Sequence, residues 1–165
     1  MKIIEDTRQQ AGKHDTKHEQ WFEAGVELIR SKLAFGDYAL PPVVAVDTKA
    51  SILELAMDID QQHERFRREL IAAQEAGCLL VILTENEDGV TDLATLSTWQ
   101  NPRRFINERR GLRPPITGAR LAKACMTMQR RYGARFEFCR PDEAAARVVE
   151  ILIEEGGRDG RNIAP

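Results

Sequence analysis

Three charged side chains interrupt an apolar segment, FGDYALPPVVAVDTK, that covers residues 35–49 and has the pattern of two paired strands. Side chains alternate between the two faces of a strand, so Asp47 and Lys49 point the same way and Thr48 points the other way. Burying a charge is costly unless it is paired. The segment therefore predicts a site at which Asp37, Asp47 and Lys49 act together.

The length of the turn decides whether the two aspartates meet. A two-residue loop pairs Leu40 with Val43 and sends Asp37 and Asp47 to opposite faces. A three-residue loop pairs Leu40 with Val44 and brings Asp37 across from Asp47. The chemistry expected of this segment requires the second register or a bulge with the same effect.

Two neighbouring carboxylates repel each other and raise each other's pKa unless a cation lies between them. Mg²⁺, or Mn²⁺, suits such a site because it takes a few carboxylate and carbonyl oxygens and keeps water ligands. The expected ligands are Asp37, Asp47 and the backbone carbonyl of Thr48, with Asp6 as a further ligand or supporting group. Lys49 is expected to orient or deprotonate a water, or to stabilise charge on a phosphate. The simpler interpretation makes Asp37 a turn residue and Asp47 with Lys49 an exposed ion pair.

Basic residues gather in the second half of the chain. The net charge of the whole chain is −2, but residues 101–140 hold eleven basic and two acidic residues, and 11 − 2 = +9. So one-sided a charge predicts a surface for a polyanion, while the alternative is a set of solvated helix faces. Nine residues are expected to contact DNA: Arg103, Arg104, Arg109, Arg110, Arg113, Arg120, Lys123, Arg130 and Arg131.

The chain has the length of one domain, with 165 residues of which 42% are hydrophobic and 30% charged. No signal peptide or membrane span is visible, and three scattered cysteines are typical of free thiols, so we expect a cytoplasmic protein without a membrane partner. One domain is predicted over residues 1–155, followed by a flexible tail over residues 156–165.

Apolar periodicity predicts an α/β fold with a mixed central sheet flanked by helices. Strands are expected over residues 2–7, 26–33, 78–85 and 134–139, and a hairpin of two paired strands is expected over residues 35–49. Helices are expected over residues 19–23, 51–77, 117–133 and 141–155. A polar loop is expected over residues 8–18, and a linker between residues 86 and 116.

The order IIEDTRQ, FGDYAL, VAVDTKAS, long helix and LLVILTE resembles the nuclease domain of the XPF family of structure-specific endonucleases, over roughly residues 1–140. That family belongs to the restriction-endonuclease-like PD-(D/E)XK group. The resemblance implies that Asp37 is the aspartate of the Gly-Asp motif. It also implies that Asp47 and Lys49 are the outer members of Glu-Arg-Lys, and that Asp6 and Arg8 form the first motif, with Arg8 binding DNA.

Three positions depart from that family's pattern. Gln9 replaces a glutamate, and Thr48 replaces the central arginine. Loss of that arginine would weaken binding of the substrate, and segment 101–115 would then supply replacement phosphate contacts. Glu54 stands one position away from the usual acidic residue. Its spacing from Ser51 favours a capping box, S-x-x-E, over a catalytic role.

The resemblance implies a Mg²⁺- or Mn²⁺-dependent DNA endonuclease for branched, flap or single-strand/double-strand junction DNA, in repair or recombination. Two other interpretations remain open: a non-catalytic DNA-binding or scaffold protein with a degenerate nuclease fold, and a junction resolvase or restriction-type enzyme. Relatives usually carry a targeting module, for which this chain has no room, so a homodimer or a separate targeting protein is expected.

Other notable residues favour structural roles. His14 and His18 have metal-like spacing but are expected in a solvated loop. Arg65, Arg67 and Arg68 are expected on the polar face of the long helix, with DNA contact as the alternative. Trp21 and Trp99 are expected in the core, with stacking on a base as the alternative.

Overall fold

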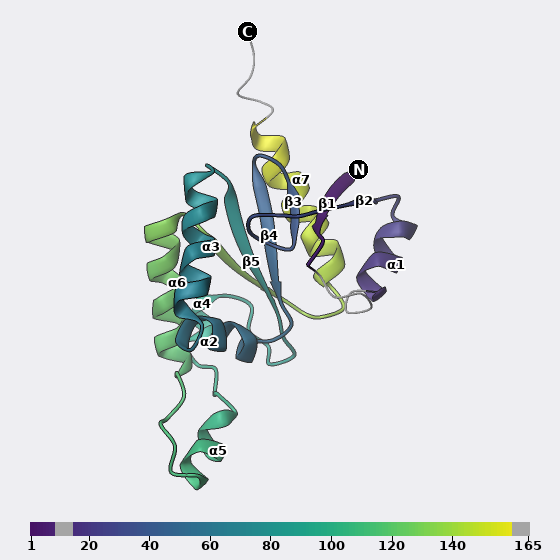
Figure 1. Ribbon diagram of the computed structural model, residues 1–165. Helices are drawn as coiled ribbons and strands as arrows, with labels where there is room; N and C mark the ends of the chain where they lie inside the picture. The colour runs from purple at the N-terminus through teal and green to yellow at the C-terminus, as the bar shows by residue number, and fades with distance from the viewer. Residues whose placement is uncertain (9–14, 160–165) are drawn as a thin grey trace.

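The computed structural model describes residues 1–8 and 15–159, which build one six-stranded mixed sheet with the order β2-β1-β3-β4-β5-β6 (Figure 1). The strands are β1 (Lys2–Asp6), β2 (Glu27–Ser31), β3 (Tyr38–Leu40), β4 (Val44–Lys49), β5 (Leu79–Glu85) and β6 (Arg135–Cys139). The pairs β1/β2, β4/β5 and β5/β6 are parallel, and β3 runs antiparallel to both β1 and β4. The predicted α/β class with a mixed sheet is confirmed.

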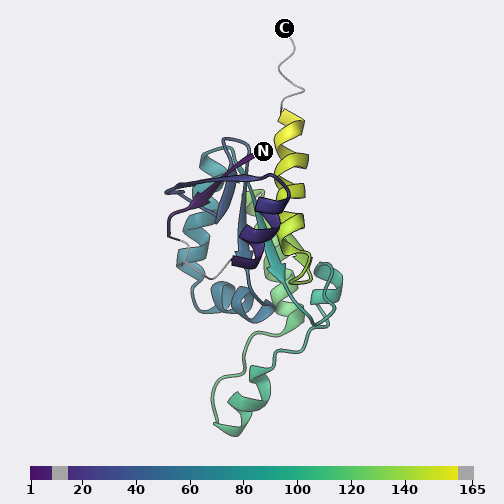
Figure 2. The same cartoon turned by 90° about the vertical axis from the view of Figure 1, so that its right-hand side faces the viewer.

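Helices cover both faces of the sheet, which therefore buries β4 and β5 on both sides and explains their nearly continuous apolar sequences. The helices are α1 (Asp15–Glu23), α2 (Ile52–Asp60), α3 (His63–Glu75), α4 (Leu93–Leu96), α5 (Arg103–Arg109), α6 (Gly118–Tyr132) and α7 (Ala144–Asp159). One apolar core joins α2, α3 and α6 to the sheet, and a second joins α1 and α7 to the other face (Figure 2).

The hairpin between β3 and β4 has the three-residue loop that the site chemistry requires. Leu40 pairs with Val44 and Tyr38 pairs with Val46, so of the two possible registers the structure has the one that the expected chemistry requires. Just before β3, the Asp37 amide donates to the Val46 carbonyl at 2.8 Å. This bond ties the turn that carries Asp37 directly to β4.

Several predicted elements differ from the structure. The single helix expected over residues 51–77 is two helices, because the helical hydrogen bonds stop after the C-cap Gln61 and resume in α3. The polar loop expected over residues 8–18 is wrong for residues 15–18, which belong to α1. The linker expected between residues 86 and 116 contains α4, which an Asp92–Thr95 capping box starts, and α5.

The final helix continues to Asp159 instead of ending near Glu155. The last residues of the predicted tail, 160–165, lie outside the described residues, as do Gln9 and His14. None of the helices in residues 1–8 and 15–159 has both the length and the apolar character of a membrane span.

Both tryptophans pack in the interior, as predicted. Trp21 is buried, donates from Nε1 to the Ala145 carbonyl at 2.8 Å and meets the Tyr38 ring edge-on at 4.9 Å between centroids. Trp99 is buried and donates to Asp88 at 3.1 Å. The three cysteines are free thiols, in agreement with the sequence.

Candidate active site

A cavity of about 520 Å³ opens between α3 and the segments around β1, β3 and β4. Its charged lining from the sheet side consists of Asp6, Arg8, Asp37 and Asp47. Its charged lining from α3 consists of Arg65, Arg68 and Glu69. The fold thus brings together three of the four predicted catalytic residues, and the fourth, Lys49, contacts Asp47 from behind the cavity wall.

Asp37 is held in place by Thr48. The Thr48 amide donates to Asp37 Oδ2 at 2.8 Å, and the Thr48 hydroxyl donates to the same oxygen at 2.6 Å. The sequence indicated only a lost arginine at position 48, but the structure gives the threonine hydroxyl a positioning contact that an arginine would not make in this form. This contact fixes one predicted metal ligand relative to the strand that carries the other.

Lys49 lies between two buried carboxylates. Its Nζ is 2.6 Å from Asp47 Oδ2 and 2.7 Å from Asp58 Oδ2, and its side chain is only 6% exposed. Asp58 is itself buried and also accepts from Arg65 at 2.7 Å. This series of ion pairs joins the cavity to α2, which carries Asp58, and to α3, which carries Arg65.

Sequence reasoning missed Asp58 and Glu69. Asp58 stands beside Ile59 within the buried face of α2, and an aspartate on an apolar helix face was the available signal. Glu69 lines the cavity and accepts from the Gly36 amide at 3.0 Å, next to Asp37 in the chain. Gly36 has a φ of +71°, so the turn that presents Asp37 uses a backbone conformation that favours glycine.

Burial raises the pKa values of three acidic groups of the cavity. Burial, together with the charges of Asp37 and Asp58, raises the pKa of Asp47 to about 7 even though Lys49 lowers it. Burial also raises the pKa values of Asp37 and Glu69. Burial alone would lower the pKa of Lys49, but Asp47 and Asp58 outweigh burial and raise it, so the ammonium stays charged.

Asp6 differs from the other two aspartates because Arg8 neutralises it. Arg8 donates from Nε to Asp6 Oδ2 at 2.6 Å and from Nη2 to the Leu33 carbonyl at 2.8 Å. Burial would raise the pKa of Asp6, but the hydrogen bonds and charge of Arg8 lower it below its usual range. This pairing favours a supporting role for Asp6, with Arg8 fixed at the cavity rim.

The oxygen donors of the cavity suit a metal that needs few protein ligands. Among the described residues, no three histidine, cysteine or acidic side chains come together as a complete metal cluster. Asp37 and Asp47 are nonetheless hard oxygen donors in one polar cavity, and a cation between them would relieve their mutual repulsion. Mg²⁺ is commonly held by one or two carboxylates plus water and substrate phosphate, so the residues fit it.

Glu54 caps α2 and takes no part in the cavity. Its amide donates to Ser51 Oγ at 3.1 Å, and its carboxylate accepts from the Ala50 amide at 2.8 Å. The Ser51 half of the expected capping box is confirmed, whereas the Glu54 carboxylate bonds the amide one residue before the N-cap. Of the two histidines with metal-like spacing, His14 and His18, only His18 is described. Its Nε2 lies 2.7 Å from Oε1 of Glu5.

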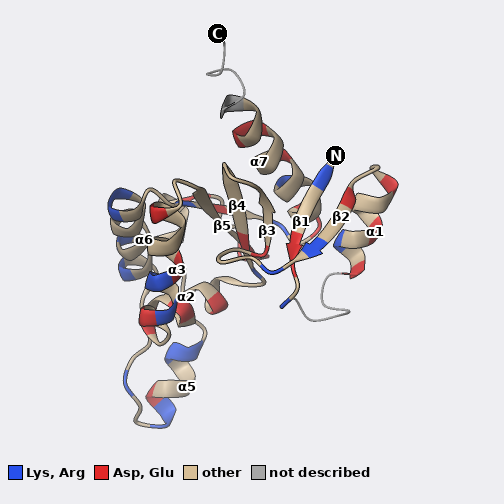
Figure 3. Ribbon diagram, turned by 45° about the horizontal axis from the view of Figure 1, so that its top comes forward, with Lys and Arg blue, Asp and Glu red and all other residues tan. Residues whose placement is uncertain are grey.

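The predicted DNA-binding residues of the second half lie on α5, its connections and α6 (Figure 3). Eight of them are exposed and Arg103 is half-buried. Within the described ranges none of these nine forms an ion pair with an acidic side chain. Their charges are therefore not neutralised within the described structure.

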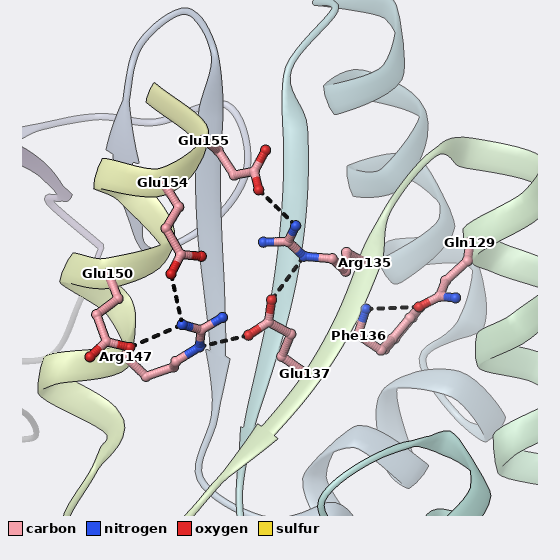
Figure 4. Close-up of polar contacts among 8 residues, drawn as sticks. All are labelled: Gln129, Arg135, Phe136, Glu137, Arg147, Glu150, Glu154 and Glu155. Carbon is pink, nitrogen blue, oxygen red and sulfur yellow. Dashed lines mark hydrogen bonds and ion pairs between the residues drawn. The ribbon is translucent and has the colours of Figure 1, made fainter. Parts of the chain in front are cut away.

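Other arginines of the same stretch are neutralised. Arg135 pairs with Glu137 at 2.8 Å and Glu155 at 2.9 Å, and Arg147 pairs with Glu137 at 2.9 Å (Figure 4). Arg140 pairs with Asp142 at 3.0 Å. Of the eleven basic residues between 101 and 140, the nine predicted to contact DNA are the ones without an ion pair in the described structure, and they lie on α5 and α6 with their flanking loops.

Comparison with known proteins identifies structures of the same fold. No protein-family model and no curated protein matches the sequence. The structure is similar to XPF from Aeropyrum pernix, with a TM-score of 0.63 and 20% identity over 95% of this chain. It is equally similar to XPF from Aeropyrum pernix in complex with DNA, with a TM-score of 0.63 and 20% identity over 96% of this chain. The chain covers 64% and 66% of those two chains, less than two thirds of their length, and the match confirms the expected XPF-like nuclease fold.

Proposed function

We propose that the protein is a metal-dependent DNA endonuclease that hydrolyses phosphodiester bonds in branched, flap or junction DNA. The observation that carries the proposal is that Asp37 and Asp47 line one polar cavity of an XPF-like fold, with Lys49 paired to Asp47 behind it. A similar chain has been solved in complex with DNA, which supports DNA as the polyanion. The uncompensated arginines of α5 and α6 supply the matching charge.

Each residue of the cavity has a role in this proposal. Asp37 and Asp47 would hold Mg²⁺ or Mn²⁺, with Thr48 orienting Asp37 by its hydroxyl and offering its backbone carbonyl. When bound, the ion would supply Lewis acidity toward a phosphoryl oxygen and toward the attacking water. Lys49 is a poor proton acceptor between two carboxylates, so its role is to stabilise negative charge on the phosphate or to orient the water. Arg65 and Arg68 line the same cavity and are placed to contact the DNA backbone.

A second function is supported by the small number of acidic ligands and by the loss of the family's arginine at Thr48. A non-catalytic DNA-binding protein with this fold would keep the arginine surface and lose the metal. Calorimetric titration with Mn²⁺ separates the two functions. An enzyme is expected to show binding that disappears in Asp37→Asn and Asp47→Asn, whereas a degenerate site shows no such binding.

Asp58 is expected to act as a positioning residue for Lys49. Asp58→Asn keeps the side-chain shape but removes the charge that holds Nζ at 2.7 Å. We expect kcat to fall roughly 10- to 100-fold with little change in KM, the size seen when supporting partners of a site are removed. Asp60→Asn, an exposed substitution at the end of the same helix, serves as the control. Equal kcat values for Asp58→Asn and Asp60→Asn would show that Asp58 does not position Lys49 for the reaction.

The proposed activity is tested by incubating the purified protein with an end-labelled forked DNA. Nicking is expected with Mg²⁺ or Mn²⁺, and none is expected with EDTA. Cleavage that continues unchanged in EDTA would show that the carboxylate pair does not act through a metal.

A further inference from the structure

A narrow arm, residues 101–117, projects from the body of the protein and carries α5 at its far end (Figure 1, Figure 2). Side-chain bonds hold its two sides together. At the base, buried Asn101 donates from Nδ2 to the Ile116 carbonyl at 3.0 Å. Near the tip, Asn107 donates to the Arg113 carbonyl at 2.8 Å. These two hydrogen bonds connect the two sides of the arm, so the arm holds its side chains in defined positions.

The arm keeps large apolar side chains in solvent. Phe105 is 68% exposed, Ile106 is 51% exposed and Leu112 is 54% exposed. None of the three belongs to either apolar core. Grouped apolar side chains on a surface indicate a partner, because leaving them in water gives no stability to the fold.

The charge of the arm identifies the chemistry of that partner. Arg103, Arg104, Arg109, Arg110 and Arg113 accompany the three apolar residues, and Glu108 is the arm's one acidic residue. Within the described part of the chain none of these arginines has an acidic partner, as noted above. A polyanion with flat apolar faces is a nucleic acid with unpaired bases, since a closed duplex hides the base faces and a junction exposes them.

We propose that the arm recognises the junction itself, with Phe105 stacking on the first unpaired base and the arm arginines binding the flanking phosphates. This inference rests on the proposed function and deepens it, because it assigns the choice of forked over continuous DNA to a structure outside the cavity. The base of the arm supports this assignment. Arg103 and Ile116 border a small cavity together with Leu53 and Met57 of α2, the helix that also carries Asp58. The base of the arm therefore adjoins the helix that carries Asp58.

The test measures binding in EDTA, so that it does not depend on cleavage. The probe is a fork with 2-aminopurine at the first unpaired position, and a continuous duplex of equal length is the comparison. Phe105→Ala is expected to weaken fork binding roughly tenfold, the usual size for one lost aromatic–base contact, and to abolish the fluorescence change. Phe105→Tyr is expected to retain both. Phe22→Ala is the matched control, because Phe22 is 83% exposed but lies on α1.

Three outcomes would overturn the inference. In the first, Phe105→Ala leaves fork binding and fluorescence unchanged; in the second, it weakens fork and duplex binding equally. In the third, Phe105→Ala has a different sedimentation coefficient from the wild type in the absence of DNA. The third outcome would assign the arm to contact between protein chains. Failure of the proposed function is seen separately. A fluorescence response without any Mg²⁺-dependent cleavage contradicts the nuclease and supports the arm, whereas cleavage without the response contradicts only the arm.

Discussion

Asp47→Asn is expected to reduce Mg²⁺-dependent cleavage roughly a thousandfold while leaving the protein folded. The substitution keeps the side-chain volume but removes the carboxylate that faces the cavity beside Asp37. Lys49 keeps its second partner, Asp58, so no buried cation is left without a counter-charge. Single-turnover cleavage of a labelled fork measures the effect, and the melting temperature shows whether the fold is intact.

The matched control for Asp47→Asn is Asp60→Asn, which changes an exposed aspartate of α2 and is expected to cleave like the wild type. Restored cleavage of Asp47→Asn by Mn²⁺ alone would still agree with a metal ligand at this position. Cleavage at the wild-type rate in Mg²⁺ would place the chemistry elsewhere.

Lys49→Met is expected to abolish cleavage and also to lower the free energy of unfolding by roughly 3–5 kcal/mol. The reason is that Lys49 is the cation between two buried carboxylates, and its removal leaves Asp47 and Asp58 facing each other without it. Urea unfolding at neutral pH measures the loss of stability, and fork cleavage measures the loss of activity.

The double variant Lys49→Met with Asp58→Asn separates these two effects. It removes one of the stranded charges, so part of the lost stability should return, whereas cleavage should stay absent. A single variant as stable as the wild type would show that the Lys49 ion pairs contribute nothing to the fold. A double variant that cleaves would exclude Lys49 from the reaction.

Local sequence patterns predicted the grouping of Asp37, Asp47 and Lys49 because all three residues lie in or next to one hairpin. Alternation along a strand put Asp47 and Lys49 on one face, and the ion pair at 2.6 Å agrees. The three-residue turn was one of two possible registers, and only the structure selects it. The order of motifs along the chain also predicted the fold, since the strands that carry the motifs are adjacent in the sheet.

Contacts between distant elements were beyond the reach of these patterns. Asp58 reaches Lys49 only because α2 folds back over β4, and the helical period does not reveal where the long apolar pattern breaks near Gln61. The hydrogen bond from Thr48 to Asp37 depends on the turn that begins at Gly36.

In residues 101–140, the sequence gives the number of charged residues but not which of them form ion pairs. A count of residues treats Arg135 and Arg109 alike, because it cannot see partners. In the structure, Arg135 is bound by two glutamates, whereas Arg109 has no ion pair within the described residues. Pairing is set by β6 and α7 coming together, so only the folded chain shows that Arg135 is paired.

Cleavage of a panel of structured DNAs shows whether Asp47 and its cavity form a metal-dependent nuclease site. Wild type and Asp47→Asn are incubated with fork, flap, four-way junction and continuous duplex DNA, each with Mg²⁺ and with EDTA. We expect the wild type to nick branched substrates near the junction only with Mg²⁺, and Asp47→Asn to nick them roughly a thousandfold more slowly. Equal nicking by both proteins, or none by the wild type on any substrate with Mg²⁺ or Mn²⁺, would contradict this expectation.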